Sequence, residues 1–178
     1  EFKGFQTEDG LVRALYELPQ LKARLSMTYR PDPRGGLQVT QKLETLAEEE
    51  EVGDMPALFR FGIRFNTSKK HNKLRYYGKG PHENYADRAD AAFVGLYTQQ
   101  VADQFYPYIR PQENGTRTDI RWWELSDHTG AGLRISSDSL FSASALHYSI
   151  ETLDDIPAKH NRHSRNLKEA DFTQCCMD

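Results

Sequence analysis

Hydrophobic and polar positions alternate with a period of two along much of this chain, which is typical of β-strands that bury one face and wet the other. The clearest run is residues 59–65, where every odd position is apolar. The same alternation runs through residues 21–29 and 37–45. Shorter strands are predicted at residues 11–16, 73–77, 118–125, 132–137, 141–148 and 172–176.

Turn-forming residues separate these strands. Residues 31–36 and 127–130 read as turns, and the acidic run 48–51 as a solvated loop. One short helix is predicted at residues 149–156, before Pro157. Many strands with almost no helix indicate an all-β, antiparallel sandwich. We expect residues 19–178 to form this domain and residues 1–18 to be its first strand or the tail of a preceding segment.

Composition narrows the classes of partner. The 178 residues are 38% hydrophobic, which is enough for a core, and carry a net charge of -3, so neither nucleic acid nor a membrane surface is an expected partner. No apolar window reaches the ~18 residues of a membrane span. Cys175 and Cys176 are adjacent, and neither CxxC nor HExxH spacing occurs. A disulfide and a metal site are therefore unsupported, and the role of these cysteines stays open.

The first cluster of polar and charged residues lies in residues 80–88. Arg88 is placed to pair with Glu83 or Asp87 and fix the loop, or else these groups contact a polar ligand. The segment reads mainly as a structural motif. Its members are Gly80, Pro81, Glu83, Asn84, Tyr85, Asp87 and Arg88.

A second polar segment covers residues 108–117. Asn114 and Gly115 suit a turn that needs positive φ, which would aim Glu113 and Arg117 outward. Planar hydrogen-bonding groups beside aromatic faces are typical of sugar sites, although neighbouring tryptophans on a strand must face opposite ways. The candidate carbohydrate contacts are Glu113, Asn114, Arg117, Trp122 and Trp123. The aromatic residues at 97–108 are interpreted as core or interface.

Residues 80–88 and 111–117 resemble the "GPxENYxDR" and "PQENGxR" signatures of the C-terminal, small-chain domain of family 2 β-galactosidases. The resemblance extends over roughly residues 11–178. It implies a galactose-mutarotase-like β-supersandwich, the last domain of a hydrolase that cleaves terminal β-D-galactosides such as lactose with retention. In that family both catalytic glutamates lie in a (β/α)₈ barrel, for which this chain has no segment. No residue here is therefore expected to be catalytic, and the isolated chain is expected to be inactive.

The resemblance also implies partners and cofactors. The expected partners are the other domains of the parent chain, especially its catalytic barrel, together with galactosides, and a homo-oligomer is a further candidate assembly. The family often uses Mg²⁺ and Na⁺, bound mainly outside this domain, so no cofactor is expected within the chain. Relatives continue past the position of Asp178 with a Gly-rich segment bearing a Ser-Trp pair, so a truncated sandwich with an exposed edge is expected.

Two alternatives stay open on the residues. A stand-alone galactoside-binding module is motivated by Trp122, Trp123 and residues 113–117. An aldose mutarotase would need an acid and a base, for which His147 with a glutamate is a candidate pair. Linkage preference and compartment, cytoplasmic or periplasmic, are not determined by the sequence.

Overall fold

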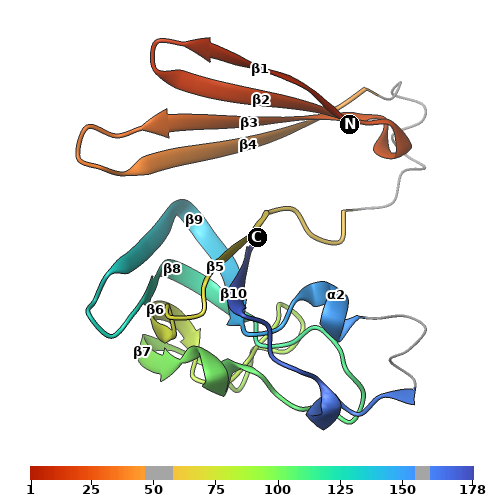
Figure 1. Ribbon diagram of the computed structural model, residues 1–178, viewed down its shortest axis with the longest axis vertical. Coiled ribbons are helices and arrows are strands. Elements are labelled where there is room, and N and C mark those ends of the chain that lie inside the picture. The colour runs from red at the N-terminus through yellow and green to blue at the C-terminus, as the bar shows by residue number, and fades with distance from the viewer. Residues whose placement is uncertain (47–57, 155–160) are drawn as a thin grey trace. The chain divides into compact units, whose positions relative to one another are not determined.

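The computed structural model describes residues 1–46, 58–154 and 161–178. Its strands form two antiparallel sheets, one of four strands in the order β1-β2-β3-β4 and one of six in the order β5-β10-β9-β8-β6-β7 (Figure 1). The predicted all-β, antiparallel class is confirmed. Backbone contacts divide the chain into two compact units, residues 1–59 and 60–178. The acidic run 48–51 lies outside the described residues.

The first unit is a meander of neighbouring hairpins. Its elements are β1 (Phe2–Glu8), β2 (Leu11–Leu18), the 3₁₀ turn η1 (Pro19–Leu21), β3 (Ala23–Pro31) and β4 (Leu37–Thr45). Asp9 and Gly10 both adopt positive φ, 49° and 73°, in the turn between β1 and β2. Ala14 and Ala23 are the buried apolar residues described in this unit. Residues 1–18 thus supply β1 and β2.

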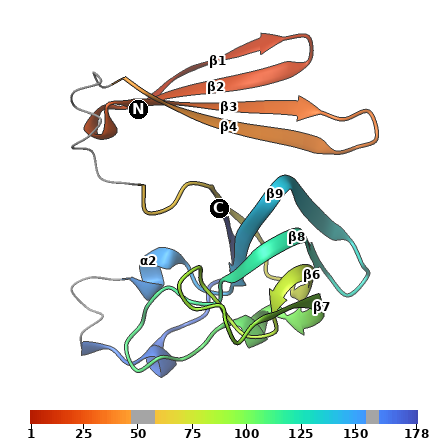
Figure 2. The same cartoon turned by 180° about the vertical axis from the view of Figure 1, so that it is seen from behind.

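The second unit contains both the longest and the shortest of the described strands, and it is seen from behind in Figure 2. Its strands are β5 (Ile63–Ser68), β6 (Lys73–Gly80), β7 (Phe93–Gln100), β8 (Arg117–Ser126), β9 (Gly132–Leu146) and β10 (Phe172–Met177). Its helical elements are η2 (Val101–Gln104), α2 (Ile150–Leu153) and η4 (Ser164–Asn166). Two of the five pairs of consecutive strands are not neighbours in this sheet: β10, β9 and β8 lie between β5 and β6, and β6 lies between β7 and β8.

The strand predicted at residues 59–65 is wrong over its first half. The ladder between β5 and β10 runs from Ile63 opposite Met177 to Ser68 opposite Phe172, so the strand begins at Ile63. Phe59 is 98% exposed and Phe61 is 42% exposed. Alternation alone is therefore not sufficient to make a strand, because a strand also needs a neighbour with which to pair.

Two other predictions are corrected at element boundaries. The strands predicted at 132–137 and 141–148 form one strand, β9, because the polar run between them stays extended while its register with β8 shifts. Helix α2 covers only Ile150–Leu153 of the predicted 149–156. Ser149 caps it by accepting a 3.1 Å hydrogen bond from the Thr152 amide. Residues 155–156 of the prediction lie outside the described residues.

The core of the second unit lies on one face of the six-stranded sheet. Trp123 is fully buried and stacks on Tyr76 with ring centroids 5.3 Å apart. Tyr76 in turn packs against Tyr97, also at 5.3 Å. The buried cluster comprises Leu74, Tyr76, Val101, Ile120, Trp123, Leu125, Ala143, Ala145, Cys175 and Met177. This core fixes the ends of β6 and β8, from which both polar segments extend.

Candidate functional site

The first polar segment leaves β6 through a tightly packed glycine. A β-carbon at Gly80 would lie 2.3 Å from the Tyr76 hydroxyl and 2.9 Å from the Tyr97 ring, so only glycine fits there. The peptide bond between Gly80 and Pro81 is cis. The chain then turns away from the sheet into residues 82–88.

Asn84 fastens this loop to the start of β8. Its Oδ1 accepts hydrogen bonds from the amide and the hydroxyl of Thr118, at 3.0 and 2.6 Å. Its Nδ2 donates to the carbonyls of Lys79 and His82, at 3.2 and 2.9 Å. The Asn84 amide donates to the Thr116 carbonyl at 2.8 Å. Asn84 is 1% exposed, so its polar groups are satisfied by protein alone.

Glu83 connects the first segment to the second. Its Oε1 accepts a 2.6 Å hydrogen bond from Arg88 and a short one from the Tyr108 hydroxyl. Its Oε2 accepts a 2.8 Å hydrogen bond from the Gly115 amide. Of the two partners considered for Arg88, the structure selects Glu83, while Asp87 is exposed. The pairing raises the pKa of the Arg88 guanidinium, through its hydrogen bonds to Tyr108 and Glu83.

Glu113 makes the reciprocal connection from the second segment. It accepts hydrogen bonds from the hydroxyls of Tyr85 and Thr116, at 3.1 and 3.0 Å. The Arg60 guanidinium lies 3.4 Å away. Burial, and then the negative charges of Glu113 and Glu83, raise the pKa of Tyr85. Each segment thus holds the other through one glutamate, an arrangement we call the reciprocal brace: Glu83 to Gly115, and Glu113 to Tyr85.

The turn at Gly115 forms as predicted, but it does not aim its neighbours outward. Gly115 has φ of 82°. Asn114 is 1% exposed and Arg117 2%. The Asn114 side chain accepts from the Tyr106 amide at 3.1 Å and donates to the Gln112 carbonyl at 2.9 Å. The turn points inward because the Asn114 side chain supplies hydrogen-bond partners to backbone groups of the surrounding loops.

Arg117 is a buried cation held by backbone carbonyls. Its two terminal nitrogens donate to the carbonyls of Gly115 and Pro81, at 2.8 and 2.9 Å. Its Nε has no hydrogen-bond partner within the described part of the chain. No ion pair joins it to a carboxylate of the described residues. Burial raises the pKa of the neighbouring Tyr76, and the Arg117 charge opposes that rise.

These loops surround a pocket of about 420 Å³. Its walls come from residues 81–88, η2, the aromatic residues that follow η2, and the start of β8. The lining residues are Pro81, His82, Glu83, Arg88, Gln99, Asp103, Gln104, Phe105, Tyr106, Tyr108 and Arg117. Of the candidate carbohydrate contacts, Arg117 lines this pocket. Gln104 was missed by sequence reasoning, because a single glutamine beside an aromatic segment carries no motif.

Neither tryptophan lines this pocket. Trp123 is fully buried in the core. Trp122, on the other face of the sheet, carries the guanidinium groups of Arg134 and Arg75 over its ring, 4.3 and 5.6 Å from the centroid. The ring of each tryptophan is therefore in contact with other side chains of the protein.

His147 is buried, and its Nδ1 lies 3.2 Å from the Thr173 hydroxyl. Burial is the main cause of a lowered pKa at this histidine. Cys175 and Cys176 are free and buried, and burial raises the pKa of the Cys175 thiol to about 12. A thiol with such a pKa is a poor nucleophile at neutral pH.

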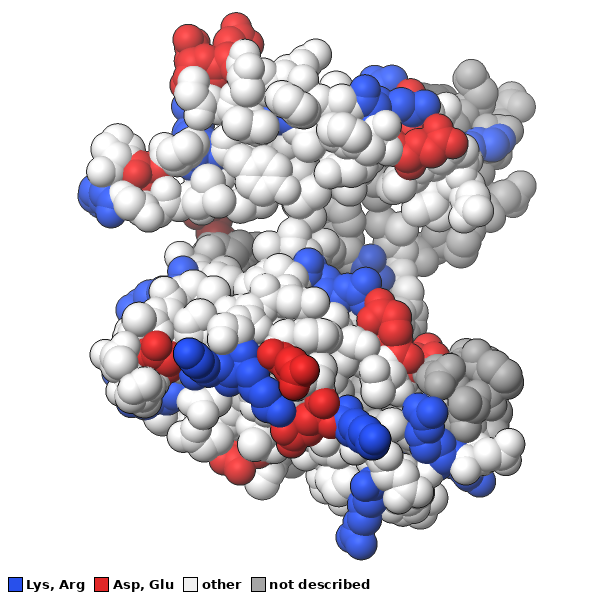
Figure 3. Space-filling view, viewed as in Figure 1, with Lys and Arg blue, Asp and Glu red and all other residues white. Residues whose placement is uncertain are grey.

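In residues 1–46, 58–154 and 161–178, no group of three or more His, Cys, Asp or Glu side chains is arranged to hold a metal ion. No helix found in the same residues is both long and apolar enough to cross a membrane. Acidic and basic side chains are interspersed over the surface seen in Figure 3, so no field of one sign dominates that face.

Comparison with known proteins identifies the family. The model of the β-galactosidase small chain matches residues 2–178. The β-galactosidase of Lactobacillus delbrueckii subsp. bulgaricus is 38% identical over 146 residues, which is 81% of this chain and 14% of the relative. The β-galactosidase of Streptococcus thermophilus is 33% identical over 172 residues, 94% of this chain and 16% of the relative. β-Galactosidase BgaC of Bifidobacterium adolescentis is 34% identical over 145 residues, 79% and 13% respectively. This chain, which spans only a small part of the length of those relatives, belongs to the β-galactosidase small-chain family.

Proposed function

We propose that the chain is the C-terminal accessory domain of a family 2 β-galactosidase that hydrolyses terminal β-D-galactosides with retention of configuration. The observation that carries the proposal is the match of residues 2–178 to the small-chain family, together with relatives named β-galactosidase that are much longer than the chain. In this proposal the bond is broken in a separate catalytic barrel, and the two sheets belong to a galactose-mutarotase-like supersandwich that supports it.

The use of the two motif glutamates supports an accessory role. A retaining glycosidase needs a nucleophilic carboxylate and an acid/base carboxylate about 5–5.5 Å apart, both reaching the scissile bond. Glu83 is only 12% exposed and accepts from Arg88, Tyr108 and the Gly115 amide. Glu113 accepts from Tyr85 and Thr116. Both carboxylates are engaged in holding loops, which leaves them poorly suited to attack an anomeric carbon.

The chain's contribution is then mechanical. Charge-assisted hydrogen bonds are roughly twice as strong as neutral ones, so the reciprocal brace holds residues 81–88 and 105–117 in one arrangement. A rigid wall of this kind can fix the shape of an adjoining substrate cleft. The described residues hold no group of three or more His, Cys, Asp or Glu side chains that could bind a metal ion, and we propose that any Mg²⁺ or Na⁺ of the parent enzyme binds mainly outside them.

The test compares the purified 178-residue chain with the full-length protein that contains it. We expect the chain alone to release no nitrophenol from a nitrophenyl β-galactoside above the buffer blank, and the full-length protein to do so. NMR of the first sugar released should show the β-anomer. Turnover by the chain alone, or release of the α-anomer, would contradict the proposal.

A substitution of Glu83 distinguishes a structural role of this residue from a catalytic one. Glu83→Gln in the full-length protein should lower kcat/KM by about tenfold, because the carboxylate's charge-assisted bonds are lost while the chemical groups remain. Asp87→Asn, in the same loop but exposed, is the matched control and should change little. A loss of several orders of magnitude for Glu83→Gln in a folded protein would instead indicate a direct catalytic role.

A further inference from the structure

Asn114 and Gly115, which form the buried turn before β8, are also a chemically labile pair. The sequence has six asparagines, and Asn114 is the one that a glycine follows. An asparagine deamidates when the backbone nitrogen of the next residue attacks its side-chain carbonyl carbon, and glycine has no β-carbon to hinder that attack. The asparagine most prone to deamidation by its sequence therefore lies at the centre of the second polar segment.

The reaction converts the side-chain amide into a carboxylate. A bond forms between the Gly115 nitrogen and the Cγ atom of Asn114, the bond from Cγ to Nδ2 breaks, and ammonia leaves with the proton of the Gly115 amide. Water then opens the cyclic imide at one of its two carbonyls. The product is aspartate, or isoaspartate, in which the backbone runs through the side chain. Water is the co-reactant, so the step needs neither an oxidant nor a cofactor.

The folded chain restrains the attacking nitrogen. The Gly115 amide donates a 2.8 Å hydrogen bond to Oε2 of Glu83. The Gly115 carbonyl accepts a 2.8 Å hydrogen bond from Arg117, so this residue is held at both ends. Attack also requires the amide nitrogen to give up its proton. The negative charge that develops there would lie beside the Glu83 carboxylate, which opposes it.

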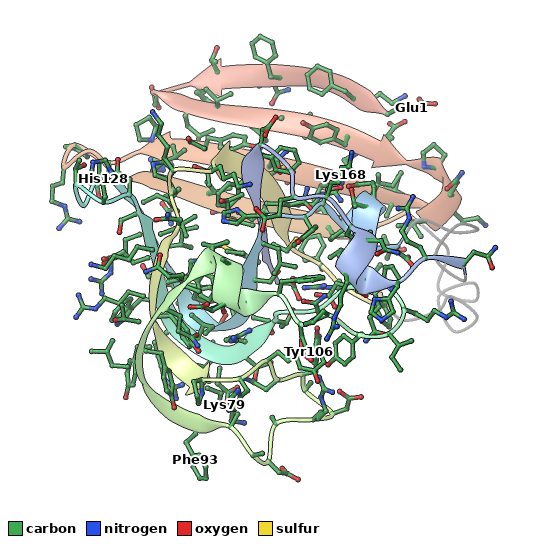
Figure 4. All side chains as sticks on the ribbon, turned by 60° about the horizontal axis from the view of Figure 1, so that its bottom comes forward. Glu1, Lys79, Phe93, Tyr106, His128 and Lys168 are labelled. Carbon is green, nitrogen blue, oxygen red and sulfur yellow. The ribbon has the colours of Figure 1, made fainter. Side chains whose placement is uncertain are left out.

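The side chain under attack is held as well. Oδ1 of Asn114 accepts a 3.1 Å hydrogen bond from the amide of Tyr106, on the loop after η2 (Figure 4), and Nδ2 donates a 2.9 Å one to the Gln112 carbonyl. Asn114 is 1% exposed. Two hydrogen bonds at opposite ends of a planar amide fix its plane, so its face is not free to turn toward the Gly115 nitrogen.

We propose that Asn114 is a deamidation site gated by the Glu83 half of the reciprocal brace. It reacts when Glu83 releases the Gly115 amide and is preserved while that bond is intact. Glu83 is itself held by Arg88 and Tyr108, so the gate opens by local unfolding of both polar segments together. The site lies within the second unit, and the proposal does not depend on what the parent protein hydrolyses.

The product does not fit the turn. A carboxylate at position 114 has no donor for the Gln112 carbonyl and would carry a charge where the side chain is buried. The Glu83 carboxylate, bonded to the next residue, adds repulsion between like charges. Isoaspartate also lengthens the backbone, although a β-carbon at Gly115 would already lie 3.0 Å from the Gln104 carbonyl oxygen. Reaction at Asn114 is therefore expected to open these loops irreversibly.

The test ages the 178-residue chain at mildly alkaline pH and follows position 114 by peptide mass spectrometry, with enzymatic methylation to detect isoaspartate. We expect Asn114 to react at least about tenfold more slowly in the folded chain than in the same chain in concentrated urea. Equal rates in the two conditions would overturn the proposal, because the fold would then give no protection.

Variants test whether the brace is the gate. Glu83→Gln replaces charge-assisted hydrogen bonds by neutral ones and should raise the rate in the folded chain about tenfold. Asp87→Ala, at an exposed position of the same loop, is the matched control and should leave the rate unchanged. In urea all three chains should react equally. A folded Glu83→Gln variant that reacts at the parent rate, or a difference between the chains that persists in urea, would overturn the gate.

Each variant is first checked by thermal unfolding. If Glu83→Gln does not fold, Tyr108→Phe decides, because it keeps the half-buried ring and removes one hydroxyl bond to Glu83. This smaller change should raise the rate about threefold. Reaction of folded Tyr108→Phe at the parent rate would then contradict the proposal.

Discussion

The two compact units are built from the same element, the antiparallel strand, yet they differ sharply in what they bury. In the first unit the described buried apolar residues are Ala14 and Ala23, while large side chains such as Phe5 remain exposed. In the second unit Trp123 and Tyr76 are fully buried. The first unit has short hairpin connections, whereas the second has long loops that fold back beside its sheet. Strand pairing thus makes a sheet in both, but among the described residues large buried aromatic side chains are found in the second unit alone.

The difference in buried core between the two units is tested most directly by producing each unit as a separate fragment. We expect residues 60–178 to fold alone and melt cooperatively, and residues 1–59 to remain largely unfolded, because sheets without a covered apolar face are marginal in water. Circular dichroism of the two fragments measures this. A cooperative transition in the 1–59 fragment, or the absence of one in the 60–178 fragment, would show that the two units do not differ in this way.

Within the second unit, the largest effect of one residue is expected at Trp123. Trp123→Ala leaves a cavity against Tyr76 and should lower the free energy of unfolding by about 3–5 kcal/mol. Phe2→Ala, an aromatic truncation in the first unit at a side chain 57% exposed, should change it by at most about 0.5 kcal/mol. Urea titrations of both variants give the comparison, and similar losses would show that the first unit holds a core of its own.

A smaller effect is expected where the polar loops are anchored. Asn84→Ala leaves the amide and hydroxyl of Thr118 without their acceptor and should cost about 2–3 kcal/mol. Asp87→Ala, three residues later and exposed, should be neutral within about 0.5 kcal/mol. Equal unfolding midpoints for the two variants would remove Asn84 from its anchoring role.

The smallest effect concerns pH. The folded pKa of His147 is lowered from its ordinary value of 6.5, chiefly by burial, so the unfolded chain binds this proton more readily. Stability should therefore fall as the pH drops below about 6.5, and the contribution should level off below the folded pKa. His147→Gln should flatten this part of the profile of unfolding free energy against pH. An unchanged slope in the variant would assign the effect to other groups.

The sequence predicted most of the strands, because period-two alternation follows directly from strand geometry, but it gave no strand for β1 or β7. It located β4 and nearly all of β8 and β10. It placed a strand too early at residues 59–62, since alternation reports an amphipathic face and not the presence of a neighbouring strand. It divided β9 at a serine-rich run, because serine favours turns unless pairing holds the chain extended.

The candidate site was harder to predict from the sequence than the strands were. Both motifs were found from their turn and charge chemistry, but the sequence left the partner of Arg88 open and expected Arg117 to point outward. The burial of Arg117 depends on the carbonyl of Pro81, 36 residues earlier, with which no local pattern associates it. Gln104 lines the same pocket as Arg117, and no local pattern associates these two residues either.

The reciprocal brace has a consequence for engineering hybrids of this family. Glu83 reaches the Gly115 amide and Tyr85 reaches Glu113, so each loop carries half of the other's support. Transplanting residues 81–88 alone from a relative would bring in a glutamate aimed at a host turn it was not matched to. We expect exchanges of both loops together to succeed where exchange of either one fails, so that the pair behaves as a single inheritable part.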